Sequence, residues 1–170
     1  LGDEMGLGKS LQSLLWAYRH PEARPIIIVC PATIKWNWQH ECVHHFGWNA
    51  EVIEGTRPDT GKTFAPSSIT ILNYDILYAW LDHLKALGPK LVIVDECGSY
   101  LGAMWTRRTK AVRALCKGVP YVIALSGTPI INRPIEFFPT LNILKPKLFP
   151  SYNTFGHRFG GPRRIPWGSG

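Results

Sequence analysis

The 170-residue sequence predicts an α/β fold, in which a parallel sheet is covered by helices on both faces. Four short runs are rich in Ile, Val and Leu and are bounded by Gly, Pro or polar residues: 25–30, 68–74, 90–96 and 121–127. They are almost continuously apolar, as expected for strands buried on both faces. Helices are predicted before and between these runs, at 9–20, 34–46, 75–87 and 106–117. Alternation of strand and helix is typical of a parallel sheet, because parallel strands need crossover connections.

Composition indicates a folded domain with a basic surface. Hydrophobic residues make up 45% of the sequence and aromatic residues 12%. The net charge of +7 favours a polyanionic partner such as nucleic acid, although many basic proteins bind none. The apolar runs are far shorter than the roughly 20 residues of a membrane span, so no membrane association is expected. The four cysteines form no CxxC pair, which favours a reduced, intracellular compartment.

A glycine-rich segment near the beginning, LGDEMGLGKSL, matches most of the phosphate-binding pattern G-x-x-x-x-G-K-[ST]. Gly6, Gly8, Lys9 and Ser10 fit this pattern, whereas Asp3 occupies its first glycine position. Glycines allow backbone N–H groups to converge on phosphate oxygens, Lys9 would reach the β- and γ-phosphates, and the Ser10 hydroxyl would bind Mg²⁺. The alternative is a glycine turn that only caps a helix and leaves Lys9 in solvent.

Two adjacent acids, Asp95 and Glu96, end the apolar run LVIVDE. Parallel sheets bind ligands at the carboxyl ends of their strands, and nucleotide hydrolysis needs both an acid beside Mg²⁺ and a base that orients water. Asp95 is therefore predicted to be the magnesium-side acid and Glu96 the general base. A solvated acidic turn is the alternative, which the upstream glycine segment disfavours. Ser126, Gly127 and Thr128 follow the next run and could sense a γ-phosphate, although SGTP alone is more often an ordinary turn.

The motifs DEMGLGKS, VDEC and LSGTP, in this order, resemble those of the first RecA-like lobe of superfamily two helicases. More narrowly, they resemble the Swi/Snf-type DNA-translocating ATPases, whose phosphate loop has Asp at the position of Asp3. The stretches VCPATIKWNWQHE, ITILNYDIL and SGTPIINRPIEFFPTLNILKPKLFP also resemble this family, including Asn132, Arg133 and Pro134. FGHRFGGPRRIPWG is similar to the annealing-helicase, fork-remodelling branch. The resemblance predicts a RecA-like P-loop NTPase lobe.

The resemblance implies an ATP hydrolase that uses ATP and Mg²⁺ to move along duplex or branched DNA, often without separating the strands. It assigns ATP binding to Asp3, Glu4, Met5, Gly6, Leu7, Gly8, Lys9 and Ser10. It assigns catalysis to Lys9, Asp95 and Glu96, with Mg²⁺ held by Ser10 and Asp95. Coupling between nucleotide state and lobe movement is assigned to Ser126, Gly127 and Thr128. Contact with one DNA strand is assigned to Pro31, Thr33, Lys35, Asn73 and Tyr74.

The sequence departs from the family pattern in two ways. Gly98 stands where the family has His, so weaker activity or coupling is expected without loss of ATP binding. The strand before the phosphate loop is missing, as is the second lobe, so we expect an N-terminally truncated fragment that alone hydrolyses ATP poorly. Residues 1–145 are predicted to form the ATP-binding lobe, with a surface loop at 54–68. Residues 146–170 are expected to be an extended or partly disordered segment leading towards the second lobe.

Several other residues allow a functional and a structural interpretation. His40, Cys42, His44 and His45 could bind zinc, but a helix with polar histidines is favoured. Trp36 and Trp38 could stack on bases, but packing onto the sheet is favoured. The basic segment 106–110 could equally contact phosphates or begin a solvated helix.

Two other functions stay open: a non-catalytic nucleotide- or DNA-binding module, and another superfamily two enzyme that acts on RNA or in restriction. The expected location is the nucleus in a eukaryote and the cytoplasm in a prokaryote or virus.

Overall fold

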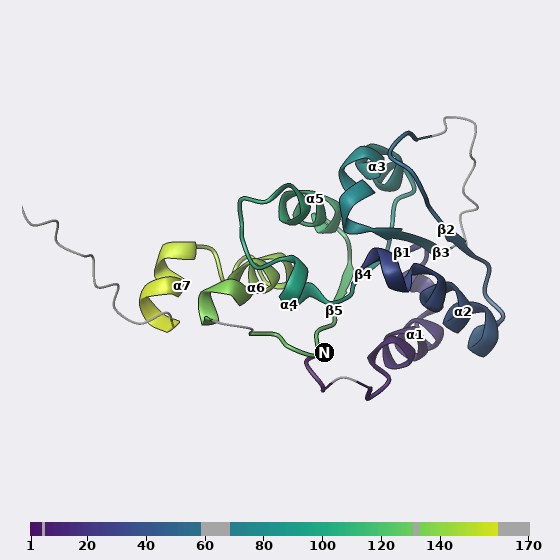
Figure 1. Cartoon of the computed structure of the whole chain (residues 1–170), viewed down its shortest axis with the longest axis horizontal. Coiled ribbons are helices and arrows are strands. Elements are labelled where there is room, and N and C mark those ends of the chain that lie inside the picture. Colours follow the sequence, from purple (N-terminus) through teal and green to yellow (C-terminus); the bar gives the residue numbers. More distant parts are fainter. Residues whose placement is uncertain (5, 59–68, 131–132, 160–170) are drawn as a thin grey trace, which may run out of the picture.

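The computed structural model of the protein describes residues 1–4, 6–58, 69–130 and 133–159. Its sheet has five strands in the order β2-β3-β1-β4-β5, and every neighbouring pair is parallel (Figure 1). The strands are β1 Ile26–Cys30, β2 Ala50–Val52, β3 Ile69–Asn73, β4 Leu91–Val94 and β5 Tyr121–Ala124. Four of them lie inside the predicted runs, so the predicted parallel sheet is confirmed. The edge strand β2 was not predicted, because three residues are too few to give a recognisable pattern.

The central strand β1 shows why the strand sequences are continuously apolar. All five of its residues are inaccessible to solvent. Ile27 and Val29 belong to the core on one face of the sheet, whereas Ile26, Ile28 and Cys30 belong to the core on the other. Since successive side chains of a strand point to opposite faces, both faces must be covered, and every position must be apolar.

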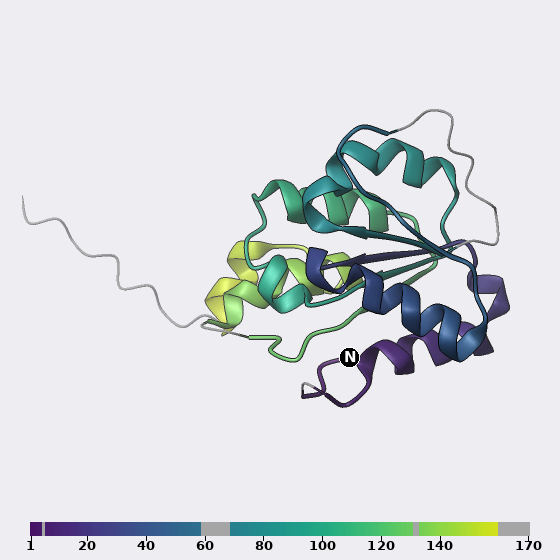
Figure 2. The same cartoon turned by 45° about the vertical axis from the view of Figure 1, so that its right-hand side comes forward.

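The long helices supply this cover on both faces (Figure 2). Helices α1 (Lys9–Arg19) and α2 (Lys35–Phe46) pack on one face, with Leu14 and Trp38 in its core. Helices α3 (Tyr74–Ala86) and α5 (Arg107–Cys116) pack on the other. All four predicted helices are confirmed to within one residue at each end. Among the described residues, no helix combines the length and the apolar character needed to cross a membrane.

Shorter helices complete the chain. They are α4 (Cys97–Tyr100), α6 (Phe138–Leu144) and α7 (Tyr152–Phe159), with 3₁₀ turns at Pro21–Ala23, Ala32–Ile34 and Pro134–Phe137. The loop expected at 54–68 has no helix or strand over its described part, residues 54–58, and residues 59–68 lie outside the described ranges.

Residues 146–170 were expected to be extended or partly disordered, but α7 gives residues 152–159 of this segment a helical structure. Phe155 is buried, and its ring lies 5.3 Å from that of Phe138 in α6. Tyr152 meets the same Phe138 ring edge-on at 5.4 Å. Aromatic residues three and four apart form one face of a helix, and this spacing was the overlooked signal. Residues 160–170 lie outside the described ranges.

The first residue extends the edge of the sheet beyond β5. The Leu1 amino group donates a hydrogen bond to the Ala124 carbonyl oxygen at 2.7 Å, and the Leu1 carbonyl accepts one from the Ser126 N–H at 3.1 Å. This is the pairing that a residue continuing a parallel strand would make. The strand expected before the glycine loop stays a prediction, but the pairing fixes where that loop begins.

We predict that Ile28→Ala will lower the free energy of unfolding by about 2–5 kcal/mol, because it leaves a cavity at the centre of the sheet. Urea denaturation would measure the change. The control is Val43→Ala on α2, whose side chain is 53% exposed and whose loss should change stability by about 0.5 kcal/mol or less. Equal effects of the two variants would contradict the central, buried position of β1.

Candidate nucleotide site

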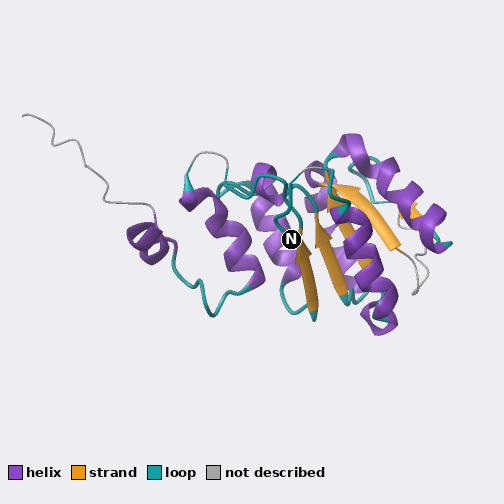
Figure 3. Ribbon diagram, turned by 90° about the horizontal axis from the view of Figure 1, so that it is seen from below, coloured by secondary structure: helices purple, strands orange, loops and turns teal. Residues whose placement is uncertain are grey.

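Three segments meet at the carboxyl edge of the sheet: the glycine loop (residues 2–8), the acidic turn (residues 95–98) and the SGTP segment (residues 126–129). Because all strands run in one direction, they end at the same edge, beside the N-terminus (Figure 3). The Cys97 N–H donates to the Leu125 carbonyl at 3.0 Å, and the Ser126 N–H donates to the Leu1 carbonyl at 3.1 Å. Main-chain hydrogen bonds therefore join the acidic turn and the residue before the glycine loop to the chain that follows β5.

The glycine loop folds back over its own lysine. The Lys9 ammonium donates hydrogen bonds to the carbonyl oxygens of Asp3 and Glu4, at 2.8 and 2.7 Å. Gly6 and Gly8 have φ values of 84° and 68°, in the left-handed region that favours glycine. Lys9 is half-buried, so the alternative of a lysine left in solvent does not describe this loop. Met5 lies outside the described residues.

The beginning of α1 is open to an anion. Gly8 is its N-cap, and no side chain of the described residues caps its first turn. Ser10 is the second residue of this helix and is half-buried. The free N–H groups and the positive end of the helix dipole suit a phosphate, and the Ser10 hydroxyl is an oxygen ligand of the kind Mg²⁺ prefers.

Asp95 follows β4 directly and is 6% exposed. Its Oδ2 accepts a hydrogen bond from the Trp38 indole N–H at 2.9 Å, and its Oδ1 accepts one from the Glu96 N–H at 2.8 Å. Its carbonyl oxygen accepts a hydrogen bond from the Tyr74 hydroxyl. Burial raises the pKa of Asp95, whereas these carboxylate hydrogen bonds and the positive charge of Lys9 act in the opposite direction. The carboxylate is thus fixed in position, with Lys9 close enough to act on it.

Glu96 is less buried and has a backbone conformation that is unusual for its residue type. Its φ is 51°, the only positive φ of a non-glycine residue among those described. Such backbone strain is concentrated at functional sites. Burial raises the pKa of Glu96, and the charge of Asp95 raises it further, whereas Lys9 and a hydrogen bond with the Gly127 N–H lower it. A carboxylate with a raised pKa, close to a lysine, has the properties of a general base.

The SGTP segment lies directly against the acidic turn. Ser126 is buried, and its Oγ accepts a hydrogen bond from the Thr128 N–H at 3.2 Å. Thr128 itself is exposed, and Gly127 is half-buried. The structure therefore brings together the predicted nucleotide, catalytic and coupling residues that it describes.

The residues predicted to contact DNA are arranged differently. Thr33 is exposed, but the other four are buried: Pro31, Lys35, Asn73 and Tyr74. The Lys35 ammonium donates to the Ile53 carbonyl at 3.1 Å and lies 3.7 Å from the Glu54 carboxylate. Tyr74 is turned inwards to the backbone of Asp95. That these residues line a face that contacts DNA stays a prediction, with four of the five side chains enclosed at the sheet edge.

Trp38 and Tyr74 are the residues whose contribution to the site was missed. For Trp38, packing onto the sheet was favoured and is confirmed, but its indole also holds Asp95. Trp36 is 53% exposed, so the same interpretation is wrong for it. The available signal was helical spacing: Trp38 and Cys42 are four residues apart and share the buried face of α2.

A zinc site at the histidines of α2 finds no support. The rings of His40 and His44 stack at 5.2 Å on the exposed side of the helix. Cys42 is on the buried side, and burial raises the pKa of its thiol to about 12, which disfavours the thiolate that a metal needs. The described residues contain no group of three or more potential metal-binding side chains.

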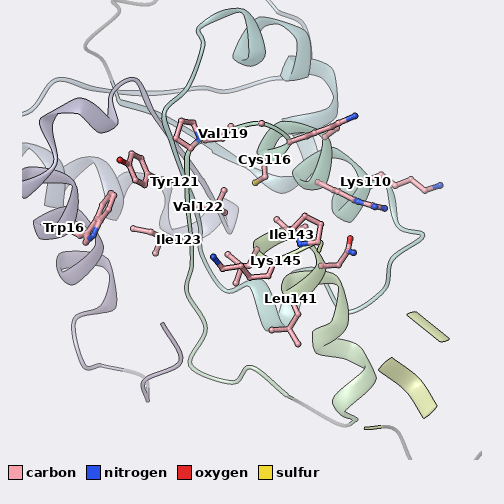
Figure 4. Close-up of a pocket in the computed structure, with 18 residues that line it drawn as sticks. Trp16, Lys110, Cys116, Val119, Tyr121, Val122, Ile123, Leu141, Ile143 and Lys145 are labelled. Atoms are coloured by element: carbon pink, nitrogen blue, oxygen red, sulfur yellow. The ribbon is translucent and has the colours of Figure 1, made fainter. Parts of the chain in front are cut away.

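The structure has a cavity of about 1120 Å³ away from these three segments. It runs along the open edge of β5, between α1 and α6, and is lined by apolar side chains such as Trp16, Tyr121, Ile123, Leu141 and Ile143 (Figure 4). None of the charged residues of the candidate nucleotide site lines it.

Comparison with known proteins adds independent information. The model of the SNF2-related domain matches residues 1–164. The SWI/SNF-related matrix-associated actin-dependent regulator of chromatin subfamily A-like protein 1 of Xenopus laevis is 32% identical over 171 residues, which are 99% of this chain and 17% of that protein. The DNA annealing helicase and endonuclease ZRANB3 of Bos taurus is 29% identical over 94% of this chain and 15% of its own length.

A solved structure, the Sulfolobus solfataricus SWI2/SNF2 ATPase core in complex with dsDNA, matches with a TM-score of 0.78 and 29% identity. It covers 91% of this chain, which spans 33% of the solved one. The match confirms the predicted RecA-like lobe. This protein therefore belongs to the SNF2-related domain family.

Proposed function

We propose that this chain is the ATP-binding lobe of a DNA-dependent ATPase that couples ATP hydrolysis to movement along duplex or branched DNA. The observation that carries the proposal is that the glycine loop, which holds Lys9, and the turn with Asp95 and Glu96 meet at one edge of the sheet, where main-chain hydrogen bonds join both to the chain after β5. A phosphate-binding loop and an acid pair that act on one another suit a single Mg·ATP. The match to an ATPase core solved in complex with dsDNA and the family membership support the same function.

In this proposal the glycine loop binds the phosphates through its N–H groups and the Lys9 ammonium, which exchanges its hydrogen bonds to loop carbonyls for phosphate oxygens. Ser10 and Asp95 are the ligands for Mg²⁺, which when bound neutralises charge on the phosphates. Glu96 orients the attacking water and accepts its proton. Ser126, Gly127 and Thr128 respond to the γ-phosphate and pass its presence to the rest of the protein.

The partners in this proposal are DNA and a second RecA-like lobe, towards which residues 146–170 lead. Thr33 is the remaining direct DNA contact among those predicted, and the buried Pro31, Lys35, Asn73 and Tyr74 would shape the surface from below. We place the protein inside the cell, and in the nucleus of a eukaryote, where its substrate lies.

The alternatives predict different behaviour. A non-catalytic module would bind ATP but show no DNA-stimulated turnover even with the second lobe present. An RNA helicase would be stimulated best by RNA. The presence of Lys9, Asp95 and Glu96 in one cluster favours the catalytic proposal, because a decayed site has no need of the acid pair.

We predict that Lys9→Ala in the full-length protein will lower DNA-stimulated ATP turnover by about 10²–10³-fold, the loss typical of one electrostatic contact to the reacting group. A phosphate-release assay with duplex DNA would measure it. Lys117→Ala, the same change at an exposed position beyond α5, should leave the rate unchanged. Wild-type protein that binds ATP but never turns it over with duplex DNA would refute the catalytic proposal.

A second prediction concerns the pH profile. Trp38→Phe removes a hydrogen bond that lowers the pKa of Asp95, so this pKa should rise, and the acidic limb of the ATPase profile should move to higher pH. The free energy of unfolding should also depend on pH through this change in the pKa of Asp95. A carboxyl whose pKa is raised by folding binds protons more tightly in the folded state, and its stabilising contribution is lost as pH rises through the folded-state pKa.

The deficit in unfolding free energy of Trp38→Phe relative to wild type should therefore grow as pH increases from acidic to neutral. Trp36→Phe, on the exposed side of the same helix, is the control and should show neither change. An unmoved acidic limb in Trp38→Phe would mean that the indole does not influence Asp95.

A further inference from the structure

Gly98 brings the acidic turn and the SGTP segment closer together than any other residue would allow. A Cβ atom at this position would lie 2.3 Å from the Thr128 carbonyl oxygen, 2.7 Å from Ser126 Oγ and 3.2 Å from Pro129 Cα. Two of these three atoms belong to the main chain, so a side-chain rotation cannot relieve the collision. The φ of Gly98 is not positive, so glycine is needed here for space and not for its backbone conformation.

The acidic turn also touches the chain after β5 at the two residues that precede this contact. One residue earlier, the Cys97 N–H donates to the Leu125 carbonyl. One residue before that, the Glu96 carboxylate accepts a hydrogen bond from the Gly127 N–H, which lowers its pKa. Three consecutive residues of the acidic turn therefore lie against the chain that follows β5, and the contact at Gly98 is the one with no spare room.

We propose that Gly98 is a positioning residue that sets the separation of these segments, and that they move as one unit when the nucleotide changes state. The inference rests on the proposed function. The Thr128 carbonyl oxygen occupies the space that a side chain at Gly98 would need, two residues from Glu96, so a shift of the SGTP segment would reach the proposed general base without an intervening side chain. From the sequence, Gly98 in place of the family's His was expected to weaken the coupling between nucleotide state and movement. In this proposal the close contact at Gly98 strengthens that coupling instead.

A side chain at position 98 has a defined mechanical consequence. To reach ordinary contact, about 3.4 Å, a Cβ now 2.3 Å from the Thr128 oxygen must push the segments apart by about 1 Å. Displacements of about this size can slow a reaction by about 10²-fold, because catalytic groups leave their productive geometry. Gly98 is not itself one of the residues proposed to bind the phosphates, so nucleotide affinity should change less than turnover.

The test compares Gly98→Ala and Gly98→His with Gly102→Ala in the full-length protein. Gly102 is four residues further on, its φ is not positive, and a Cβ there would meet no atom within 4 Å. For each variant we would measure binding of a fluorescent ATP analogue, thermal unfolding, and ATP turnover with and without duplex DNA. Gly102→Ala should match wild type in all four.

Gly98→Ala should unfold at a somewhat lower temperature than wild type, because overpacking destabilises a fold. The folded variant should bind the analogue within about twofold of wild type, but its DNA-stimulated kcat should fall by about 10–10²-fold. Gly98→His should lose at least as much, although it restores the residue typical of the family. Gly98→Ala that turns over ATP as fast as Gly102→Ala, or Gly98→His that is faster than wild type, would overturn the proposal.

A measurement on the wild-type protein covers the case in which the Gly98 variants fail to fold. Hydrogen–deuterium exchange would be followed with and without Mg²⁺ and a non-hydrolysable ATP analogue. Peptides covering residues 95–101 and 124–130 should change their protection together. A change confined to one of them would overturn the proposal.

These experiments distinguish a failure of the proposed function from a failure of the role proposed for Gly98. If wild type shows no DNA-stimulated turnover, the proposed function fails and this inference falls with it. If wild type turns over ATP and Lys9→Ala does not, while Gly98→Ala behaves as Gly102→Ala, the proposed function stands and only the role of Gly98 is wrong.

Discussion

The buried carboxylate of Asp95 sets the requirements that the surrounding structure meets. An ionised carboxylate removed from water destabilises a fold unless hydrogen bonds and a nearby cation offset the loss of hydration. The Trp38 indole approaches from α2 on one face of the sheet, and the Tyr74 hydroxyl approaches from α3 on the other. Both helices are therefore tied to the end of β4. The packing of the two layers and the geometry of the site cannot be changed independently.

The glycine loop that holds Lys9 lies at the same edge of the sheet as this carboxylate because all the strands are parallel. Leu1 pairs beside Ala124 and Ser126, which places the start of the glycine loop next to the end of β5. The end of β4 is the neighbouring position in the sheet. A loop that leaves the sheet at this point and returns as α1 must pass in front of both acids. The convergence of residues that are more than 80 positions apart in sequence follows from the order of the strands.

The sequence predicted these features to different degrees, for physical reasons. Apolar runs such as 26–30 are easy to recognise, because burial on both faces leaves no polar position in them. The position of Lys9, Asp95 and Glu96 at one edge follows from strand direction. Strand direction does not determine whether a side chain at that edge faces solvent, because its exposure depends on neighbouring residues from other elements. Lys35 was therefore expected at a DNA surface, although it is enclosed by Ile53 and Glu54. The role of Gly98 depends on a distance between two loops, which no local pattern encodes.

The balance of charge explains why a nucleotide at this edge would need a divalent cation. With both acids ionised, the pair outweighs the single ammonium of Lys9, so the cluster has a net negative charge that repels a bare triphosphate. Burial and mutual repulsion raise the pKa values of the acids for the same reason: their charge is not fully compensated by Lys9 and the hydrogen bonds around them. A cation with oxygen ligands from Asp95, Ser10 and the phosphates would reverse both effects at once. On this balance of charge, the proposed site would bind a metal–nucleotide complex more readily than a bare nucleotide.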